Sequence, residues 1–363
     1  MEWSPQQAQA LIEVSRWIKA RDRQVFRLFG YAGVGKTTLA RHLAEGVAGK
    51  VAFAAYTGKA ALALRARGCE GASTIHSLIY KATETDAETP LFKLVDDGPA
   101  ARADLIVIDE CSMVDEELGR DLLSFGKPVL VLGDPAQLPP IKGGGFFTEA
   151  EPDAMLTEIH RQAQDDPIVR LSMLAREGRD LPLGAHGDSR VIRRAEVDAK
   201  AALGADQVLA GLNKTRRALN ARIRSLKGFT KPTPEAGDKL VCLRNDRKKG
   251  LLNGGLWRVE EVRAPRGQFL QFTLKPEEET GRKAARVRVL SQFFEGGEAE
   301  IPFARRRESD EFDYGYALTA HKAQGSEWDD VLVFDESYAF RENRARWLYT
   351  AVTRAAKRIV VAR

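Results

Sequence analysis

Cysteine is scarce in this 363-residue sequence, which has only Cys69, Cys111 and Cys242. The three residues are far apart, odd in number, and none belongs to a CxxC pair. A disulfide framework and a cysteine-based zinc site are therefore excluded. We expect a protein that works in a reducing compartment.

Long apolar runs and low-complexity tracts are also lacking. No stretch approaches the ~20 apolar residues that a membrane-spanning helix needs. The first 24 residues carry charges throughout and lack the apolar core of a signal peptide. We therefore expect a soluble, cytoplasmic protein with no membrane partner.

The composition is that of a folded protein, with 44% apolar and 29% charged residues. At ~150 residues per domain, the length suggests two or three domains. Lys and Arg total 56 against 51 Asp and Glu, a net charge of +5. This small excess is compatible with a polyanionic partner but does not establish one.

Short, nearly continuous apolar runs recur along the chain, separated by helical patterns. Such runs are typical of parallel strands buried on both faces. A first series lies at 25–30, 51–57, 104–110 and 128–134, and a second at 207–211, 330–334 and 358–362. We predict an α/β fold with two units and a break near Glu151 and Pro152: one unit spans 1–150, and the other combines 151–235 with 306–363.

Two segments interrupt this rhythm. Residues 236–305 alternate apolar and polar side chains between Gly, Pro and Asn, which predicts short antiparallel strands in a small inserted barrel. Residues 81–103 are polar and predict a hairpin or a loop between two core strands.

A glycine-rich loop follows the first apolar run, at Gly30–Thr38 (GYAGVGKTT). Its spacing matches GxxxxGK[ST], in which backbone N–H groups at a helix N-terminus bind phosphate oxygens. Lys36 is expected to reach the β- and γ-phosphates and the Thr37 hydroxyl to hold Mg²⁺. The other expected nucleotide contacts of the loop are Gly33, Val34, Gly35 and Thr38.

A pair of carboxylates ends another buried run, at Asp109 and Glu110. In a phosphate-loop enzyme, the first carboxylate binds Mg²⁺ through water and the second polarises the attacking water. The pair therefore predicts nucleotide hydrolysis with Mg²⁺ as a cofactor.

Further motifs follow in a fixed order. They are YTGKAA at 56–61, STIH at 73–76, GDPAQLPP at 133–140, LTEIHR at 156–161, TAHKAQGSE at 319–327 and YTAVTRA at 349–355. In this order they resemble the superfamily 1 helicases, most closely the 5′-to-3′ branch (SF1B) that contains the RecD-like and phage Dda-like enzymes. The resemblance implies two RecA-like P-loop NTPase domains with parallel sheets, an SH3-like β-barrel at 236–305 and a short pin hairpin at 81–103.

The resemblance implies roles around the nucleotide. Gln7 reads the adenine edge, with its neighbour Gln6 as the alternative, and Gln137 senses the γ-phosphate. Arg161 and Arg354 neutralise charge on the phosphoryl group. The residues that face the nucleotide from the second domain are Gly325 and Glu327.

The resemblance also implies contacts with DNA. The stretch at 208–213 is interpreted as a strand-to-helix turn, with a contact to phosphate left open. His76 is either a DNA contact or a structural residue, and Phe92 is either the apolar tip of the pin or a core residue. The remaining implied DNA contacts are Thr57, Gly58, Lys59, Pro139, Thr319 and His321.

The implied function is that of an ATP-dependent DNA helicase or translocase that moves 5′-to-3′ on single-stranded DNA. Its partners would be single-stranded DNA and junctions between single- and double-stranded DNA, and we expect a monomer in a bacterial or phage-infected cell. The alternatives are a DNA-stimulated ATPase or translocase that does not unwind, and a P-loop NTPase or kinase that is not a motor.

Overall fold

The computed structural model describes residues 3–82, 92–140, 143–158, 166–246, 248–277 and 283–363. The chain divides into two compact units. The first unit comprises Met1–Thr85, Pro90–Asp180 and Glu342–Thr353, and the second comprises Asp86–Thr89, Leu181–Arg341 and Arg354–Arg363. No helix in the described part of the chain is long and apolar enough to cross a membrane.

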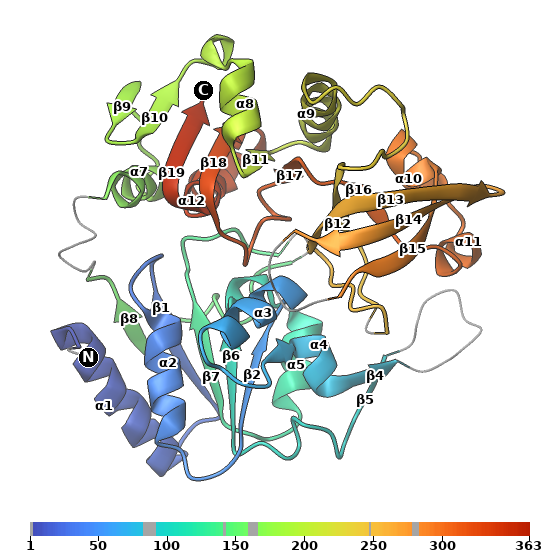
Figure 1. Ribbon diagram of the computed structural model, residues 1–363. Helices are drawn as coiled ribbons and strands as arrows, with labels where there is room; N and C mark the ends of the chain where they lie inside the picture. The colour runs from blue at the N-terminus through green and yellow to red at the C-terminus, as the bar shows by residue number, and fades with distance from the viewer. Residues whose placement is uncertain (1–2, 83–91, 141–142, 159–165, 247, 278–282) are drawn as a thin grey trace. The chain divides into compact units, whose positions relative to one another are not determined.

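The first unit is built on a sheet with the strand order β3-β2-β6-β7-β1-β8 (Figure 1). Every neighbouring pair in it is parallel. The strands are β1 (Val25–Gly30), β2 (Val51–Ala55), β3 (Ser73–Thr74), β6 (Leu105–Asp109), β7 (Val129–Gly133) and β8 (Ala154–Leu156). The predicted α/β class is confirmed.

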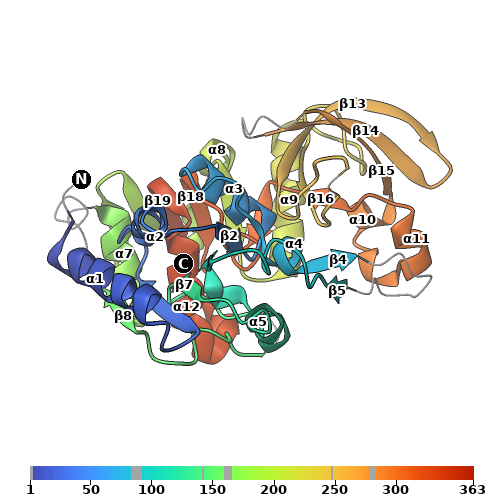
Figure 2. The same ribbon diagram turned by 90° about the horizontal axis from the view of Figure 1, so that it is seen from below.

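Helices cover both faces of this sheet, which can be followed from below in Figure 2. Leu105 and Val107 of β6 pack in one core cluster, with α1 (Pro5–Ala20) and α2 (Lys36–Glu45). Ile106 and Ile108 pack in the other. The helices of that second cluster are α4 (Ile75–Ile79) and α5 (Glu116–Leu123). Burial on both faces explains why β6 is a continuous apolar run.

The described part of the first unit has three further helices. They are α3 (Gly58–Ala66), which contacts β2 and β3, and α7 (Pro167–Arg176) and α12 (Arg344–Val352), which pack against each other. The predicted break near Glu151 and Pro152 differs from the structure. β8 lies beyond that point and pairs with Leu28–Gly30 of β1, so the first sheet continues past the break.

The interruption at 81–103 contains an antiparallel strand pair, β4 (Tyr80–Ala82) with β5 (Phe92–Leu94). The residues between these strands, 83–91, lie outside the described part of the chain, as does the side chain of Phe92. The pin hairpin and the role of Phe92 at its tip therefore stay predictions.

The second unit has a sheet with the order β17-β11-β18-β19-β10-β9. Its pairs are parallel except that β9 runs antiparallel to β10. The strands are β9 (Gly184–His186), β10 (Ser189–Ile192), β11 (Gln207–Ala210), β17 (Ala317–Thr319), β18 (Trp328–Phe334) and β19 (Ala355–Ala362). The helices α8 (Ala199–Gly204) and α9 (Asn213–Leu226) pack against each other beside it.

An antiparallel sheet with the order β15-β14-β13-β12-β16 is inserted into the second unit. Its strands are β12 (Lys239–Cys242), β13 (Leu256–Arg266), β14 (Phe269–Pro276), β15 (Ala285–Leu290) and β16 (Phe312–Tyr314), followed in part by α10 (Gln292–Glu295) and α11 (Phe303–Arg307). In β15, Arg286 and Arg288 are exposed while the alternate residues are buried, as expected of a half-buried strand. The strand β16 lies beyond the predicted range of 236–305, and the SH3-like barrel stays a prediction.

The remaining short elements are 3₁₀ helices. They are η1 (Cys111–Met113), η2 (Arg194–Glu196), η3 (Glu298–Glu300) and η4 (Ser337–Asn343).

A buried ion pair joins the inserted sheet to α9. Arg224 donates from Nε to Oδ1 of Asp238 (2.9 Å) and from Nη2 to Oδ2 (2.8 Å). Asp238 is fully buried and also accepts a hydrogen bond from the Tyr316 hydroxyl (3.0 Å). Because a buried carboxylate without such partners is costly, this pair fixes where the inserted sheet begins.

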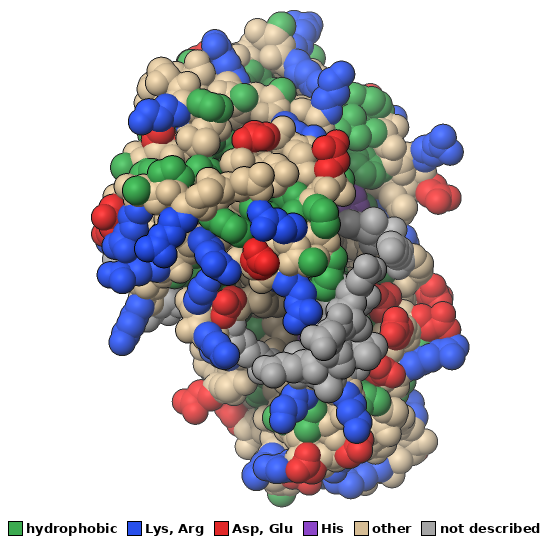
Figure 3. All heavy atoms as spheres, turned by 90° about the vertical axis from the view of Figure 1, so that its right-hand side faces the viewer, with side chains coloured by type: hydrophobic (Ala, Val, Ile, Leu, Met, Phe, Trp, Pro, Cys, Tyr) green, Lys and Arg blue, Asp and Glu red, His purple; other side chains and the backbone are tan. Residues whose placement is uncertain are grey.

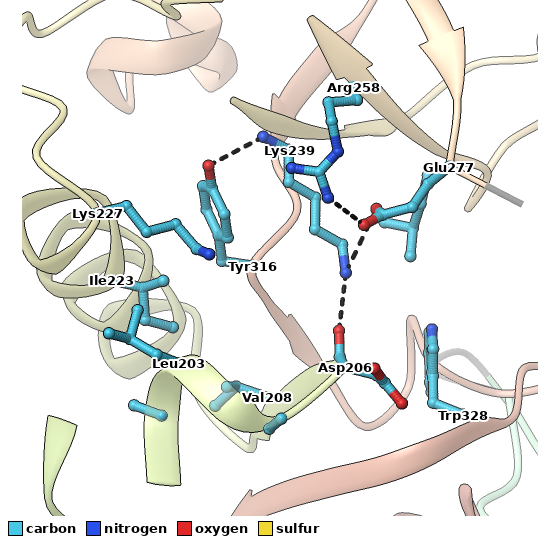
Figure 4. Close-up of a pocket in the computed structure, with 13 residues that line it drawn as sticks. Leu203, Asp206, Val208, Ile223, Lys227, Lys239, Arg258, Glu277, Tyr316 and Trp328 are labelled. Atoms are coloured by element: carbon cyan, nitrogen blue, oxygen red, sulfur yellow. Dashed lines mark hydrogen bonds and ion pairs between the residues drawn. The ribbon is translucent and has the colours of Figure 1, made fainter. Parts of the chain in front are cut away.

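Beside this ion pair lies a cavity of about 320 Å³, drawn in Figure 4. The ammonium group of Lys239 donates to the backbone oxygen of Asp206 (2.8 Å) and lies 3.4 Å from Glu277. Arg258 also pairs with Glu277 (2.6 Å). The cavity is thus crossed by contacts between the inserted sheet and the segment that precedes β11.

The Arg224–Asp238 pair predicts a large stability effect. Replacing Arg224→Ala leaves Asp238 buried without its cation, which costs about 3–5 kcal/mol. We expect the free energy of unfolding, measured by urea denaturation, to fall by this amount. Arg222→Ala, an exposed change on the same helix, is the control; a loss no larger than that of the control would contradict the prediction.

Candidate nucleotide site and neighbouring motifs

The predicted nucleotide residues gather at one edge of the first sheet. Because β1, β6 and β7 are parallel neighbours, their carboxyl ends lie side by side. Gly30, Asp109 and Gly133 are the last residues of these strands. The glycine-rich loop, the carboxylate pair and the GDPAQLPP motif are therefore neighbours, although about 100 residues separate the first from the last.

The phosphate loop connects β1 to α2. Gly33 and Gly35 have φ values of +80° and +79°, which side chains rarely adopt. At Gly30 a Cβ atom would lie 2.7 Å from a methyl carbon of Val34, so the loop closes only with glycine there. No side chain caps the N-terminus of α2, which leaves its first N–H groups to an anion. The loop therefore has the shape and polarity of a phosphate site.

Lys36 and Thr37 occupy the first turn of α2. The Lys36 ammonium group donates to the backbone oxygens of Gly30 (2.7 Å) and Tyr31 (2.9 Å). The Thr37 hydroxyl donates to Oδ2 of Asp109 (2.8 Å). This bond joins the phosphate loop to the end of β6, as a shared Mg²⁺ site requires. Thr38 is half-buried in the same turn.

The two candidate glutamines face different partners. Gln7 is 5% exposed and donates from Nε2 to the backbone oxygen of Val34 (3.0 Å) in the phosphate loop. Gln6 instead bonds to Thr157 and to the backbone N–H of Glu158 beyond β8. Of the two, Gln7 is the residue that lies against the nucleotide loop.

The carboxylate pair has an unusual backbone. Asp109 is 8% exposed, and its Oδ1 accepts a hydrogen bond from the N–H of Glu110 (2.8 Å). Glu110 has a φ of +55°, the left-handed region that non-glycine residues rarely adopt. Strained residues of this kind cluster at functional sites. The pair is followed by buried Cys111, and burial raises the pKa of its thiol, as for an inert core cysteine.

The GDPAQLPP motif forms a turn after β7. Oδ1 of Asp134 accepts a hydrogen bond from the N–H of Ala136 (3.0 Å) and so shapes the turn. Gln137 is 6% exposed, and its buried side-chain oxygen has no hydrogen-bond partner among the residues that the structure describes. Pro139 is half-buried two residues later. An unpaired buried acceptor is costly, so the Gln137 oxygen is suited to a donor that enters the site.

Two neighbouring residues of α12 reach this edge of the sheet, and sequence reasoning assigned neither a role. The Tyr349 hydroxyl accepts from the N–H of Ala32 in the phosphate loop (2.9 Å) and donates to Asp134 (2.6 Å). The Thr350 hydroxyl accepts from the N–H of Leu138 (2.9 Å). Both residues belong to the YTAVTRA motif, in which only Arg354 was assigned a role from the sequence.

These residues fit ATP and Mg²⁺. The uncapped α2 N-terminus, the cation Lys36 and the oxygen pair of Thr37 and Asp109 supply what phosphate and a hard cation need. Among the described residues no three His, Cys, Asp or Glu side chains form a metal cluster. That is compatible with Mg²⁺, which takes one or two protein ligands and completes its shell with phosphates and water.

The predicted DNA residues of the first unit follow β2 and β3. The Thr57 hydroxyl accepts from the N–H of Ala60 (3.1 Å) and caps α3, whose first two residues are Gly58 and Lys59. The His76 ring lies 6.1 Å from the Tyr56 ring and 5.8 Å from the Tyr80 ring. Partial burial lowers the pKa of His76, so its ring is neutral at pH 7. Three aromatic rings thus form a row.

In the second unit, the TAHKAQGSE motif follows β17. The Thr319 hydroxyl accepts from the N–H of Lys322 (3.3 Å), and the His321 ring packs 5.5 Å from that of Phe340. Burial lowers the pKa of His321. Gly325 has a φ of +71°, and Glu327 is exposed.

Arg354 belongs to the same unit as this motif. It is 5% exposed, and its guanidinium donates to the backbone oxygen of Ser326 (3.1 Å), between Gly325 and Glu327. The structure therefore brings these three predicted residues together. The other predicted arginine, Arg161, lies outside the described residues.

A phosphate contact was left open for the turn at 208–213. The Glu336 carboxylate, 2% exposed, already accepts from the N–H groups of Gly211 (2.8 Å) and Leu212 (2.9 Å). It also accepts from the Thr215 hydroxyl (2.6 Å). A buried carboxylate of the chain thus already binds the N–H groups of the turn directly before α9.

The chain is similar to helicases of known families. Residues 2–196 match the family model of an AAA domain, and residues 314–362 match a UvrD-like helicase C-terminal domain. An ATP-dependent RecD2 DNA helicase of Deinococcus radiodurans is 30% identical over 91% of this chain and 46% of its own length. The ATP-dependent DNA helicase dda of phage T4 is 30% identical over 48% of this chain and 43% of its own. The chain spans about half the length of these relatives.

Solved structures of Pif1 helicases have a similar fold. A structure of Pif1 helicases with forked DNA has a TM-score of 0.60 and 19% identity, covering 99% of this chain and 92% of the other. The Bacteroides Pif1 helicase in complex with ADP-AlF3 and single-stranded DNA has a TM-score of 0.58 and 18% identity, with the same coverage. These structures show a shared fold. The two family models and the relatives show that the chain belongs to the RecD/Dda-like branch of the superfamily 1 helicases.

Proposed function

We propose that the protein is an ATP-dependent DNA helicase that translocates 5′-to-3′ on single-stranded DNA and separates strands at its junctions with duplex. The observation that carries the proposal is the hydrogen bond between Thr37 and Asp109, which joins the phosphate loop to the carboxylate strand. It is the arrangement for nucleotide hydrolysis, in a chain whose family couples hydrolysis to DNA. The relatives named as ATP-dependent DNA helicases support the same function.

Binding of ATP would use groups whose present partners are replaceable. Lys36 is bonded to neutral backbone oxygens, and exchanging these for phosphate oxygens gives stronger, charge-assisted hydrogen bonds. The N–H groups from Gly33 to Thr38 would bind the phosphates, with Gln7 at the adenine. Mg²⁺, held by Thr37 and Asp109, would neutralise charge on the phosphoryl oxygens.

Hydrolysis needs an oriented water and charge neutralisation. Glu110 would accept a proton from the attacking water, and the side-chain oxygen of Gln137 would accept a hydrogen bond from the other O–H of that water. Arg354 and Arg161 would neutralise charge that develops on the phosphoryl oxygens. Gly325 and Glu327 would contribute to the same site, because they flank Ser326, whose backbone oxygen accepts a hydrogen bond from Arg354.

DNA would be held by stacking and by phosphate contacts. The rings of Tyr56, His76 and Tyr80 offer a row of surfaces for bases, which is independent of sequence. The proposed phosphate contacts are Thr57, Gly58, Lys59, Pro139, Thr319 and His321. Figure 3 shows that Lys and Arg side chains gather on one part of the face it draws and acidic side chains on another, so the net charge of +5 is an average over unlike surfaces.

Glu110→Gln tests the hydrolytic site. Removing a general base costs about 10²–10⁴-fold in kcat, while the phosphate contacts remain. We therefore expect phosphate release to fall by this factor and the affinity for a fluorescent ATP analogue to stay within a few-fold. Glu117→Gln, on the exposed side of α5, should hydrolyse normally. Normal turnover in Glu110→Gln would mean that the base is another residue.

A second experiment tests the motor itself. We expect single-stranded DNA to stimulate ATP hydrolysis, and 5′-tailed duplexes to be unwound with ATP and Mg²⁺ in a gel assay. Absence of stimulation would refute a DNA motor. Stimulation without strand separation would favour a translocase, and unwinding of only 3′-tailed duplexes would overturn the polarity.

His76→Ala tests the aromatic row. Stacking of one base contributes about 1–3 kcal/mol, so we expect about tenfold weaker binding of single-stranded DNA by fluorescence anisotropy. The lowered pKa of His76 makes the ring neutral above pH 7, so this loss should be equal at pH 7 and pH 8. His186→Ala, outside these motifs, is the control; equal affinity of the two variants would rule out stacking on His76.

A further inference from the structure

The side chain of Tyr349 is the point where three segments of the first unit meet. It is 1% exposed, and its hydroxyl is bonded on one side to the phosphate loop and on the other to the turn after β7. Both bonds are within the normal range of lengths, and the Asp134 carboxylate at one end is 2% exposed. Burial and the Asp134 carboxylate raise the pKa of the phenol, which therefore stays protonated and donates to Asp134.

The phosphate-loop end of this bridge leaves the nucleotide-binding groups untouched. Tyr349 takes the N–H of Ala32, which precedes the N–H groups expected to face phosphate. The neighbouring residue is held as well, since the Arg176 guanidinium of α7 lies 3.7 Å from the centre of the Tyr31 ring. The start of the loop is thus gripped by α7 and α12, the two helices that pack against each other.

The other end of the bridge shapes the turn that carries Gln137. Asp134 uses one oxygen for Tyr349 (2.6 Å) and the other for the N–H of Ala136 (3.0 Å). The next residue of α12, Thr350, holds the N–H of Leu138 on the far side of Gln137. Gln137 therefore sits between two backbone groups that are fixed, directly or through Asp134, by adjacent residues of one helix.

We propose that Tyr349 is a positioning residue that locks the phosphate loop and the Gln137 turn into one rigid body, and so sets where Gln137 stands relative to the phosphates. Only the expected effect on the rate of ATP hydrolysis rests on the proposed function; the bridge itself does not. Such a residue affects the chemical step more than nucleotide binding, because small displacements of a reacting group are costly in rate.

The test is Tyr349→Phe, which removes the bridge and keeps the ring. In the nucleotide-free protein we expect faster amide hydrogen exchange in peptides that cover Ala32 and residues 133–138. We expect kcat for ATP hydrolysis to fall by about 10- to 100-fold, with the affinity for nucleotide within about threefold of the original. Asp134→Asn, which keeps an acceptor for the phenol, tests the bridge from its other end and should show the same changes to a smaller extent.

The matched control is Tyr314→Phe. Tyr314 is also buried, at 7% exposure, and its hydroxyl donates to the backbone oxygen of Pro232 (2.8 Å) in the second unit. Losing that hydrogen bond should change neither exchange in the first unit nor kcat. Unchanged exchange at Ala32 in Tyr349→Phe, or a kcat equal to that of the control, would overturn the proposal. Exchange does not depend on turnover, so a protein that fails to hydrolyse ATP would refute the proposed function while the exchange result still decides the bridge.

Discussion

Parallel pairing between β1, β6 and β7 is the constraint on which the rest of the site depends. The register sets Phe29 opposite Gly133 and Ile108 opposite Val131, so the three strands end at nearly the same level. Each strand is buried on both faces by helices, so a one-residue slip would exchange the side chains of its two faces and disrupt the packing of both cores. The apolar pattern of the core thus fixes the relative heights of the phosphate loop, Asp109 and Asp134.

Hydrogen bonds of buried polar groups then fix the conformation of the loops that follow the strands. Asp134 is 2% exposed, and its oxygens are matched by two donors, one from its own turn and one from α12. Because a half-satisfied buried network is costly, the groups of such a network are stable mainly together. Helix α12 is therefore part of the candidate nucleotide site, although some 310 residues separate it from the phosphate loop.

The sequence predicted the parts of this site that depend on local pattern. The phosphate loop needs glycine at Gly33 and Gly35 because of their positive φ, and Asp109 ends an unbroken apolar strand, so both can be read from short stretches. The predicted break near Glu151 and Pro152 lies too early because β8, which continues the first sheet, has only three residues, too few for a recognisable run. β16, with three residues, was missed for the same reason.

Contacts between distant polar side chains left no local pattern at all. Nothing near Glu336 in the sequence indicates that it bonds to the turn before α9, more than 100 residues earlier. A tyrosine in a helix is, by default, interpreted as a core residue. The choice between Gln6 and Gln7 was equally open, because both follow Pro5 on the first turn of α1. In the structure Gln7 donates to the Val34 oxygen of the phosphate loop, whereas Gln6 bonds to Thr157, and the contact of Gln7 with adenine stays a prediction.

The hydrogen-bond partners of the polar side chains distinguish the residues that shape the candidate site from those that would contact the ligand. Asp134 and Tyr349 are hydrogen-bonded to each other and to backbone N–H groups of the two loops, so they fix the conformation of these loops. Lys36, in contrast, is bonded to neutral carbonyls, and Gln137 has an acceptor with no donor. A charged or donating ligand improves the bonding of these last two residues and leaves the first two undisturbed. The same fold can therefore keep its loops fixed while the nucleotide changes, because different side chains perform the two tasks.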